Sequence, residues 1–128
     1  DAAVRNKAKI MLCPGEHCYL DYPQQRGDMP EKNWGMPVTT LEQTYRLDPA
    51  WGQDNVFVRD NLLGVSGTLW SECINSTERI YYQAFPRAAA LAEAGWSVPE
   101  RRSYKEFLTR VRPLTDDMQR RGVAVNVR

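Results

Sequence analysis

The chain has 128 residues, of which 42% are apolar and 26% are charged, and its formal net charge is +1 at pH 7. This length suits one globular domain, and the interspersed charges exclude the basic surface by which proteins bind nucleic acid or an anionic membrane. No apolar run approaches the roughly 20 residues of a membrane-spanning helix, no leader is visible, and the opening at Asp1 predicts a processed or excised segment.

The first predicted elements are short. Residues 1–8 are typical of the end of a helix, and the apolar run at 9–13 predicts a buried strand that Pro14 and Gly15 end. A long polar connection then covers 14–38. Connections of this length in a compact domain are functional or disordered, and its tyrosines and tryptophan are not typical of disorder. We therefore expect a functional loop.

Two of the three cysteines lie at the start of this connection. Cys13, His17 and Cys18 are close enough in sequence to suggest a metal site, but their spacing fits no common zinc pattern and a fourth ligand is not evident. With Cys73 the cysteines are odd in number and too few for a disulfide framework. We predict buried or loop thiols, no metal and no other cofactor, and we expect His17 to be a loop residue.

A short helix and a second strand come next. A helix is predicted over 40–45, before Pro49 disfavours helical backbone, and 62–70 predicts a strand. Trp70 and Glu72 stand two residues apart where this strand runs out. Because side chains two apart in a strand point to the same face, we expect the indole ring and the carboxylate to emerge side by side.

An amphipathic helix is predicted from a cap within 75–77 to Gly95. The letters "NST" at 75–77 also match a glycosylation sequon, but their place at a helix start favours capping. Pro86 is expected to kink this helix or to leave one carbonyl unpaired. Arg87 is expected to serve helix packing or a structural ion pair.

A last helix is predicted to begin after Ser103, which forms a capping box with Glu106. Its apolar residues recur at helical spacing, namely Tyr104, Phe107, Leu108, Val111, Leu114 and Met118. Pro113 is expected to end or bend this helix, and Gly122 to close it.

The alternation of strands and helices predicts an α/β fold of parallel βα units, with helices packed on the sheet. Two strands are too few for an open α/β sheet to cover itself, so we expect this chain to be part of a larger fold. Sites in parallel α/β folds form at the carboxyl ends of strands, where this sequence places Tyr19, Asp21, Trp70 and Glu72. Rings beside carboxylates suit a sugar, whose apolar face packs on the ring and whose hydroxyls donate to the carboxylates.

Four stretches in succession resemble one enzyme family. The stretches "IMLCPGEHCYLDYP", "TLEQTYRLDP", "LLGVSGTLWSE" and "AFPRAAALAEAGWS" are similar, in order and spacing, to the end of the family 20 glycoside hydrolases, the β-N-acetylhexosaminidases. The resemblance covers almost the whole chain. It implies a (β/α)8 TIM barrel of which residues 1–128 supply the last two βα units and the C-terminal helices.

The resemblance also implies roles for five residues, all of them substrate-binding. Tyr19 matches the tyrosine that hydrogen-bonds the acetamido carbonyl, and Asp21 matches the carboxylate that binds a hydroxyl near C4 or C6. Trp70 matches a wall of the acetamido pocket, and Glu72 the carboxylate on the outer hydroxyls. Trp34 matches a further active-site aromatic in a variable loop.

The family's reaction is substrate-assisted retaining hydrolysis, in which the acetamido oxygen of the substrate attacks the anomeric carbon. An aspartate orients that group and a neighbouring glutamate protonates the leaving group. No Asp-Glu dipeptide occurs in this sequence, so the resemblance implies a segment that has part of the sugar pocket and no catalytic residue. The alternative is a non-catalytic sugar-binding or interaction module derived from such a barrel.

The partner implied by the resemblance is a glycan that contains N-acetylhexosamine, with no nucleic acid and no membrane span. We also expect self-association or binding to the missing part of the barrel, because two strands leave edges unpaired. The family resemblance alone implies an exported protein, periplasmic or secreted.

Overall fold

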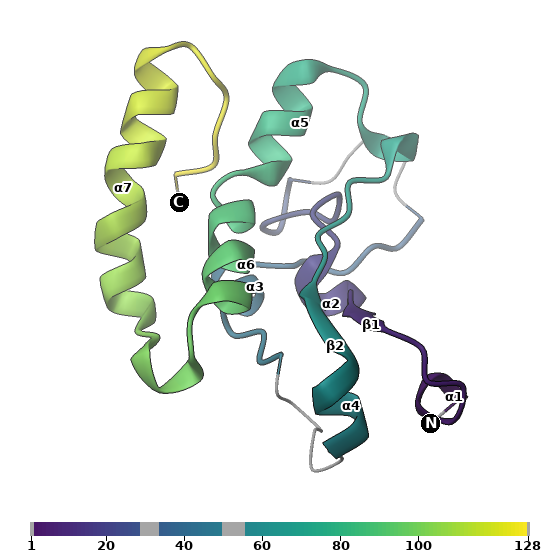
Figure 1. The fold of residues 1–128 in the computed structure, drawn as a ribbon. Helices are drawn as coiled ribbons and strands as arrows, with labels where there is room; N and C mark the ends of the chain where they lie inside the picture. The colour runs from purple at the N-terminus through teal and green to yellow at the C-terminus, as the bar shows by residue number, and fades with distance from the viewer. Residues whose placement is uncertain (1, 29–33, 50–55, 128) are drawn as a thin grey trace.

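The computed structural model describes residues 2–28, 34–49 and 56–127. In chain order its elements are α1 (Ala2–Arg5), β1 (Ile10–Leu12), α2 (Gly15–Cys18), α3 (Leu41–Tyr45), α4 (Val56–Asn61), β2 (Leu62–Val65), the 3-10 turn η1 (Ser71–Cys73), α5 (Thr77–Ala84), α6 (Arg87–Trp96), the 3-10 turn η2 (Pro99–Arg101) and α7 (Tyr104–Arg120) (Figure 1). The sequence predicted neither helix α4 nor helix α2, which lies within the connection expected over 14–38.

The two strands pair in parallel, as the sequence predicted. Ile10 lies opposite Leu62, and Leu12 lies opposite Val65. Parallel neighbours need a crossover connection between them, and here that connection holds α2, α3 and α4. The carboxyl ends of both strands therefore point to the same edge of the sheet.

The predicted strand over 62–70 is too long. After β1, Pro14 begins the helical turn α2, so the first strand has no residues left to pair with the second. Pairing resumes only at an isolated bridge between Tyr19 and Thr68, where the N–H of Leu20 donates to the carbonyl of Thr68 at 2.8 Å. The second segment is consequently an interrupted ladder that ends before residue 70.

The predicted helix over 77–95 is two helices. Phe85, which precedes the proline, has extended backbone (φ −108°, ψ 137°), as steric contact with a proline ring requires. Pro86 then stands at the start of α6. The Ser76 side chain accepts from the N–H of Arg79 at 3.1 Å, which confirms the predicted cap of α5.

The last helix begins as predicted and continues through its proline. The Ser103 side chain accepts from the N–H of Glu106 at 3.4 Å, and α7 runs to Arg120 with Pro113 inside it. Gly122, with φ +73°, follows the end of the helix, in the left-handed conformation typical of glycine at this place. None of the helices in the described ranges is long and apolar enough to cross a membrane.

Helix α6 lies between the strands and α7 (Figure 1). On one side a buried cluster joins α6 to β2 and to the α2 and α3 segments; it consists of Cys18, Leu47, Leu91 and Ala94, with Cys13 and Val65 against it. On the other side a second cluster joins α6 to α3 and α7 through Tyr45, Ala90, Phe107 and Val111. Two alanines of α6, Ala90 and Ala94, belong to these clusters.

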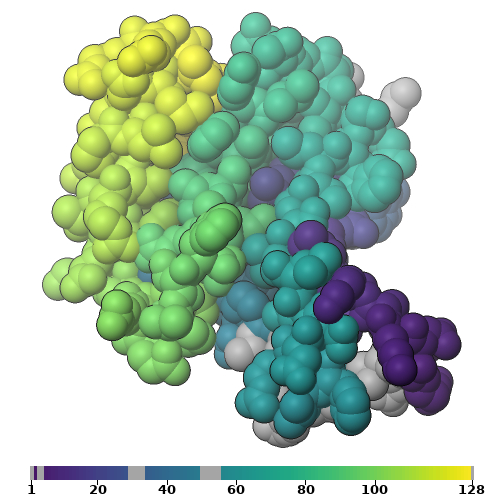
Figure 2. All heavy atoms as spheres, in the orientation of Figure 1, coloured from purple at the N-terminus to yellow at the C-terminus, as the bar shows by residue number. Residues whose placement is uncertain are grey.

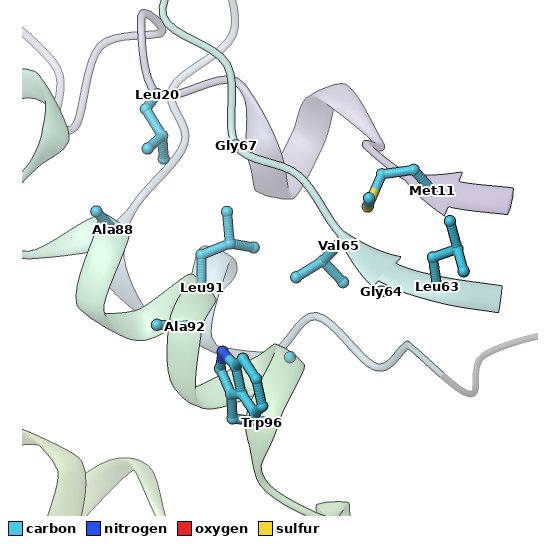
Figure 3. A pocket seen from close by; sticks show the side chains of 11 residues that line it. Met11, Leu20, Leu63, Gly64, Val65, Gly67, Ala88, Leu91, Ala92 and Trp96 are labelled. Carbon is cyan, nitrogen blue, oxygen red and sulfur yellow. The ribbon is translucent and has the colours of Figure 1, made fainter.

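An apolar groove of about 460 Å³ is lined by residues of β2 and α6, among others. Figure 3 shows Val65 on one side of this groove and Leu91 and Trp96 on the other. Trp96 is 92% exposed. The space-filling view in Figure 2 shows β2 and α4 together with α1 at one end of the molecule, away from α7.

Candidate functional site

The candidate site lies at the carboxyl ends of β1 and β2. The bridge between Tyr19 and Thr68 holds the two chain segments side by side there. Tyr19 and Asp21 follow α2, and Trp70 follows the bridge on the other segment. The sequence predicted this meeting of the two segments from the parallel pairing, and the structure confirms it.

Four aromatic rings form a continuous row at this edge, which we call the aromatic row: Trp70, Tyr19, Tyr22 and Trp34. Successive ring centroids lie 6.4 Å, 5.2 Å and 5.9 Å apart, within the range of favourable aromatic pairs. Trp70 is 50% exposed and Trp34 is 63% exposed. The two ends of the row therefore present indole surface that a ligand can cover.

Tyr22 is a member of the row that sequence reasoning missed. It is buried, and its ring joins the rings of Tyr19 and Trp34. The sequence feature that could have indicated Tyr22 is its position three residues after Tyr19, within one turn of the backbone. Burial raises the pKa of Tyr22, with the nearby Asp21 carboxylate as the next cause, so the phenol stays protonated at neutral pH.

Trp70 and Glu72 do not emerge from a strand as predicted. Trp70 precedes η1, and Glu72 lies inside that turn. The alternation of strand side chains therefore does not apply to them, since the ladder ends earlier. Glu72 is exposed, and its charge acts on Asp21 by raising the pKa of that carboxyl. Glu72 therefore affects the carboxyl of Asp21 electrostatically, although it lies in a 3-10 turn and not in the predicted strand.

Asp21 is the buried polar group of the site. It is 4% exposed, and its Oδ1 atom has no hydrogen-bond partner among the described residues. Burial raises the pKa of this carboxyl, while the backbone N–H groups of Asp21 and Trp70 and the charge of Arg87 lower it. A buried carboxylate oxygen without a hydrogen-bond donor is costly.

The raised pKa of Asp21 predicts a specific dependence of stability on pH. A folded-state pKa above the ordinary 3.8 means that ionisation of Asp21 destabilises the fold, so stability falls as the pH rises through that pKa. We expect Asp21→Asn to raise the melting temperature near neutral pH, because the amide is neutral. The gain should shrink below the raised pKa, where Asp21 is neutral too. A variant less stable than the parent at every pH would contradict this.

The other residues singled out in the sequence have structural roles. His17 belongs to α2 rather than to a loop, and its Nδ1 lies 2.5 Å from the carbonyl oxygen of Gln43. Cys13 and Cys18 are free thiols, and burial raises the pKa of Cys18 to about 12. In the part of the chain that the structure describes, no three His, Cys, Asp or Glu side chains are grouped to hold a metal ion.

The described residues at this edge offer ring surfaces and carboxylates to a ligand. Exposed indole surface lies beside one buried and one exposed carboxylate, which is the combination that holds a sugar by its apolar face and its hydroxyls. A neighbouring cavity of about 490 Å³ is lined by Met11, Leu12 and Cys13 among others.

Three comparisons with known proteins agree on one family. The model of the glycosyl hydrolase family 20 catalytic domain matches residues 1–99. A beta-hexosaminidase of Akkermansia muciniphila is 40% identical over 99 residues, which are 77% of this chain and 19% of that protein. A beta-hexosaminidase of Vibrio vulnificus is 47% identical over 105 residues, covering 68% of this chain and 12% of its own length.

Solved structures give the same result. The family 20 exo β-N-acetylglucosaminidase of Vibrio harveyi, in complex with N-acetylglucosamine, aligns with a TM-score of 0.82 and 29% identity over 98% of this chain and 20% of that one. The chain thus spans a fifth or less of the length of these relatives. Because the family model matches residues 1–99 and these relatives align with most of the chain, the chain belongs to glycosyl hydrolase family 20.

Proposed function

We propose that this chain is the part of a β-N-acetylhexosaminidase barrel that supplies one side of its sugar pocket. In this proposal the two strands are the last two of a (β/α)8 barrel, and the enzyme removes terminal N-acetylglucosamine or N-acetylgalactosamine. The observation that carries it is the aromatic row beside the buried Asp21, at the carboxyl ends of paired parallel strands. Family membership adds the substrate class, since a relative was solved with N-acetylglucosamine.

Each site residue has a proposed role that its surroundings support. Trp70 is half exposed and packs on Tyr19, which suits a pocket wall beside a phenol that donates to the acetamido carbonyl. The unpartnered Oδ1 of Asp21 suits acceptance from a hydroxyl near C4 or C6. Glu72, exposed and near Asp21, suits the outer hydroxyls, and Trp34 extends the aromatic surface.

The reaction itself requires groups outside this chain. In substrate-assisted hydrolysis the acetamido oxygen of the sugar is the nucleophile, and a separate aspartate and glutamate orient it and protonate the leaving group. The sequence has no Asp-Glu dipeptide. The role of the chain is therefore to hold the sugar so that its acetamido group reaches the anomeric carbon, a contribution of orientation.

The test compares two chromogenic substrates on the full-length protein that contains this chain. We expect hydrolysis of the aryl N-acetylglucosaminide and none of the matching aryl glucoside, because the glucoside has no acetamido nucleophile. Comparable hydrolysis of both would contradict substrate assistance. Binding of N-acetylglucosamine without any hydrolysis would overturn the enzyme in favour of a non-catalytic sugar-binding module.

A further inference from the structure

Arg87 is a buried cation with an unusual set of partners. It is 0% exposed, and its guanidinium donates at 2.6 Å to the carbonyl of Leu20, at 2.9 Å to that of Thr39, and at 2.9 Å to that of Gln83. Among the described residues it forms no ion pair within contact distance. Burial lowers the pKa of Arg87 to about 10, so it remains charged at neutral pH. Such a charge is costly to bury unless its donors are satisfied.

The contacts of Arg87 converge on the residue that carries the site carboxylate. The carbonyl of Leu20 belongs to the peptide unit before Asp21. The carbonyl of Asp21, in the peptide unit after it, accepts from Nε2 of Gln83 at 2.9 Å. Gln83 is itself buried and accepts from Arg87 through Oε1 at 3.3 Å. Arg87 and Gln83 together therefore fix both peptide units that flank the Asp21 Cα atom, and with them the direction of its side chain.

An arginine suits this place better than a neutral donor would. Its planar fork donates to several acceptors at once, and here these come from three separate segments, at Leu20, Thr39 and Gln83. Its charge also favours the ionised form of Asp21, against burial and against the charge of Glu72. One side chain thus holds the backbone beside the carboxylate and opposes, by its charge, the effect of burial on the pKa of Asp21.

We propose that Arg87, with Gln83, is a positioning residue that orients Asp21 for sugar binding; this rests on the proposed function. Arg87 does not reach the ligand edge itself, because it is enclosed between α6 and the segments around Leu20 and Thr39. It acts through the backbone on either side of Asp21. If Arg87 only stabilised the fold, its substitution would weaken sugar binding to the same extent whether or not Asp21 is also substituted.

The experiment is a double-mutant cycle on the full-length protein, with the dissociation constant for N-acetylglucosamine measured by calorimetry. We expect Arg87→Met to raise that constant roughly tenfold in the parent and by less than about twofold in an Asp21→Asn background, a ratio of about fivefold or more that corresponds to coupling of about 0.9 kcal/mol or more. Gln83→Met removes the donor to the Asp21 carbonyl and one side-chain acceptor of Arg87, and it should show the same pattern, as should Arg87→Lys to a smaller extent.

Arg102 provides a matched control. It too clamps two backbone carbonyls, those of Tyr45 and Leu47, at 3.1 Å and 2.7 Å, but it lies away from the aromatic row. We expect Arg102→Met to leave sugar binding unchanged even if it lowers the melting temperature. Equal loss of binding in Arg102→Met, or additive effects of Arg87→Met and Asp21→Asn, overturns the positioning role.

The outcomes separate this inference from the proposed function. A parent protein that neither binds nor hydrolyses the N-acetyl sugar overturns the proposed function and the inference with it. A parent that binds the sugar, loses affinity in Asp21→Asn and yet gives an additive cycle overturns the inference alone. If Arg87→Met does not fold, the cycles with Gln83→Met and Arg87→Lys decide, because each leaves part of the buried network in place.

Discussion

Trp70→Ala in the full-length protein is expected to lower kcat/KM for an aryl N-acetylglucosaminide by roughly 30- to 1000-fold, about 2–4 kcal/mol of transition-state binding. The ring is half exposed and packs on Tyr19 with centroids 6.4 Å apart. Its removal opens the proposed wall that keeps the acetamido oxygen pointed at the anomeric carbon. Loss of orientation of a nucleophile costs rate even where binding survives.

Two comparison variants make the Trp70 result specific. Trp70→Phe keeps a ring beside Tyr19 and is expected to retain most of the activity. Tyr81→Ala removes another partly exposed ring, on α5 and outside the aromatic row, and is expected to leave kcat/KM unchanged. An unchanged kcat/KM in Trp70→Ala, or an equal loss in Tyr81→Ala, would exclude Trp70 as a wall of the pocket.

The parts of the fold that depend on local chemistry could be predicted from the sequence. Ser76 and Ser103 cap α5 and α7 as their positions before helical patterns indicated. The apolar runs ended by Pro14 and preceded by Asn61 gave the two strands and their parallel pairing. Proline was the ambiguous signal: Pro86 separates two helices, whereas Pro113 lies within α7. Which outcome a proline produces depends on tertiary packing, which the local sequence does not contain.

The sequence predicted which residues of the site lie close together, but it did not predict the local backbone structure that holds them. The parallel strands bring Tyr19 close to Trp70, as predicted. The strand alternation assigned to Trp70 and Glu72 is wrong, since α2 interrupts the ladder that would have supported it. The network around Arg87 was expected only as packing or an ion pair. Its carbonyl partners are distant in sequence, and nothing in a local pattern reports which carbonyls a buried guanidinium reaches.

The chain expressed alone is expected to associate and to hydrolyse nothing. The two strands pair with each other, and Leu63 and Met11 beside the groove are exposed, as is Trp96 across it. Cavities of about 460 and 490 Å³ are both lined in part by Met11 of β1. A parallel pair is normally covered on both faces, and apolar surface next to an open strand edge favours pairing with another chain.

Light scattering coupled to size-exclusion chromatography measures this association. Leu63→Lys places a charge on the open strand and is expected to shift the chain toward monomer. Leu114→Lys, at a similarly apolar but remote position on α7, is expected to leave the mass unchanged. A monomer with cooperative unfolding at micromolar concentration would show that these residues form a complete domain. Cleavage of a chromogenic N-acetylglucosaminide by the isolated chain would show that the acid lies within it.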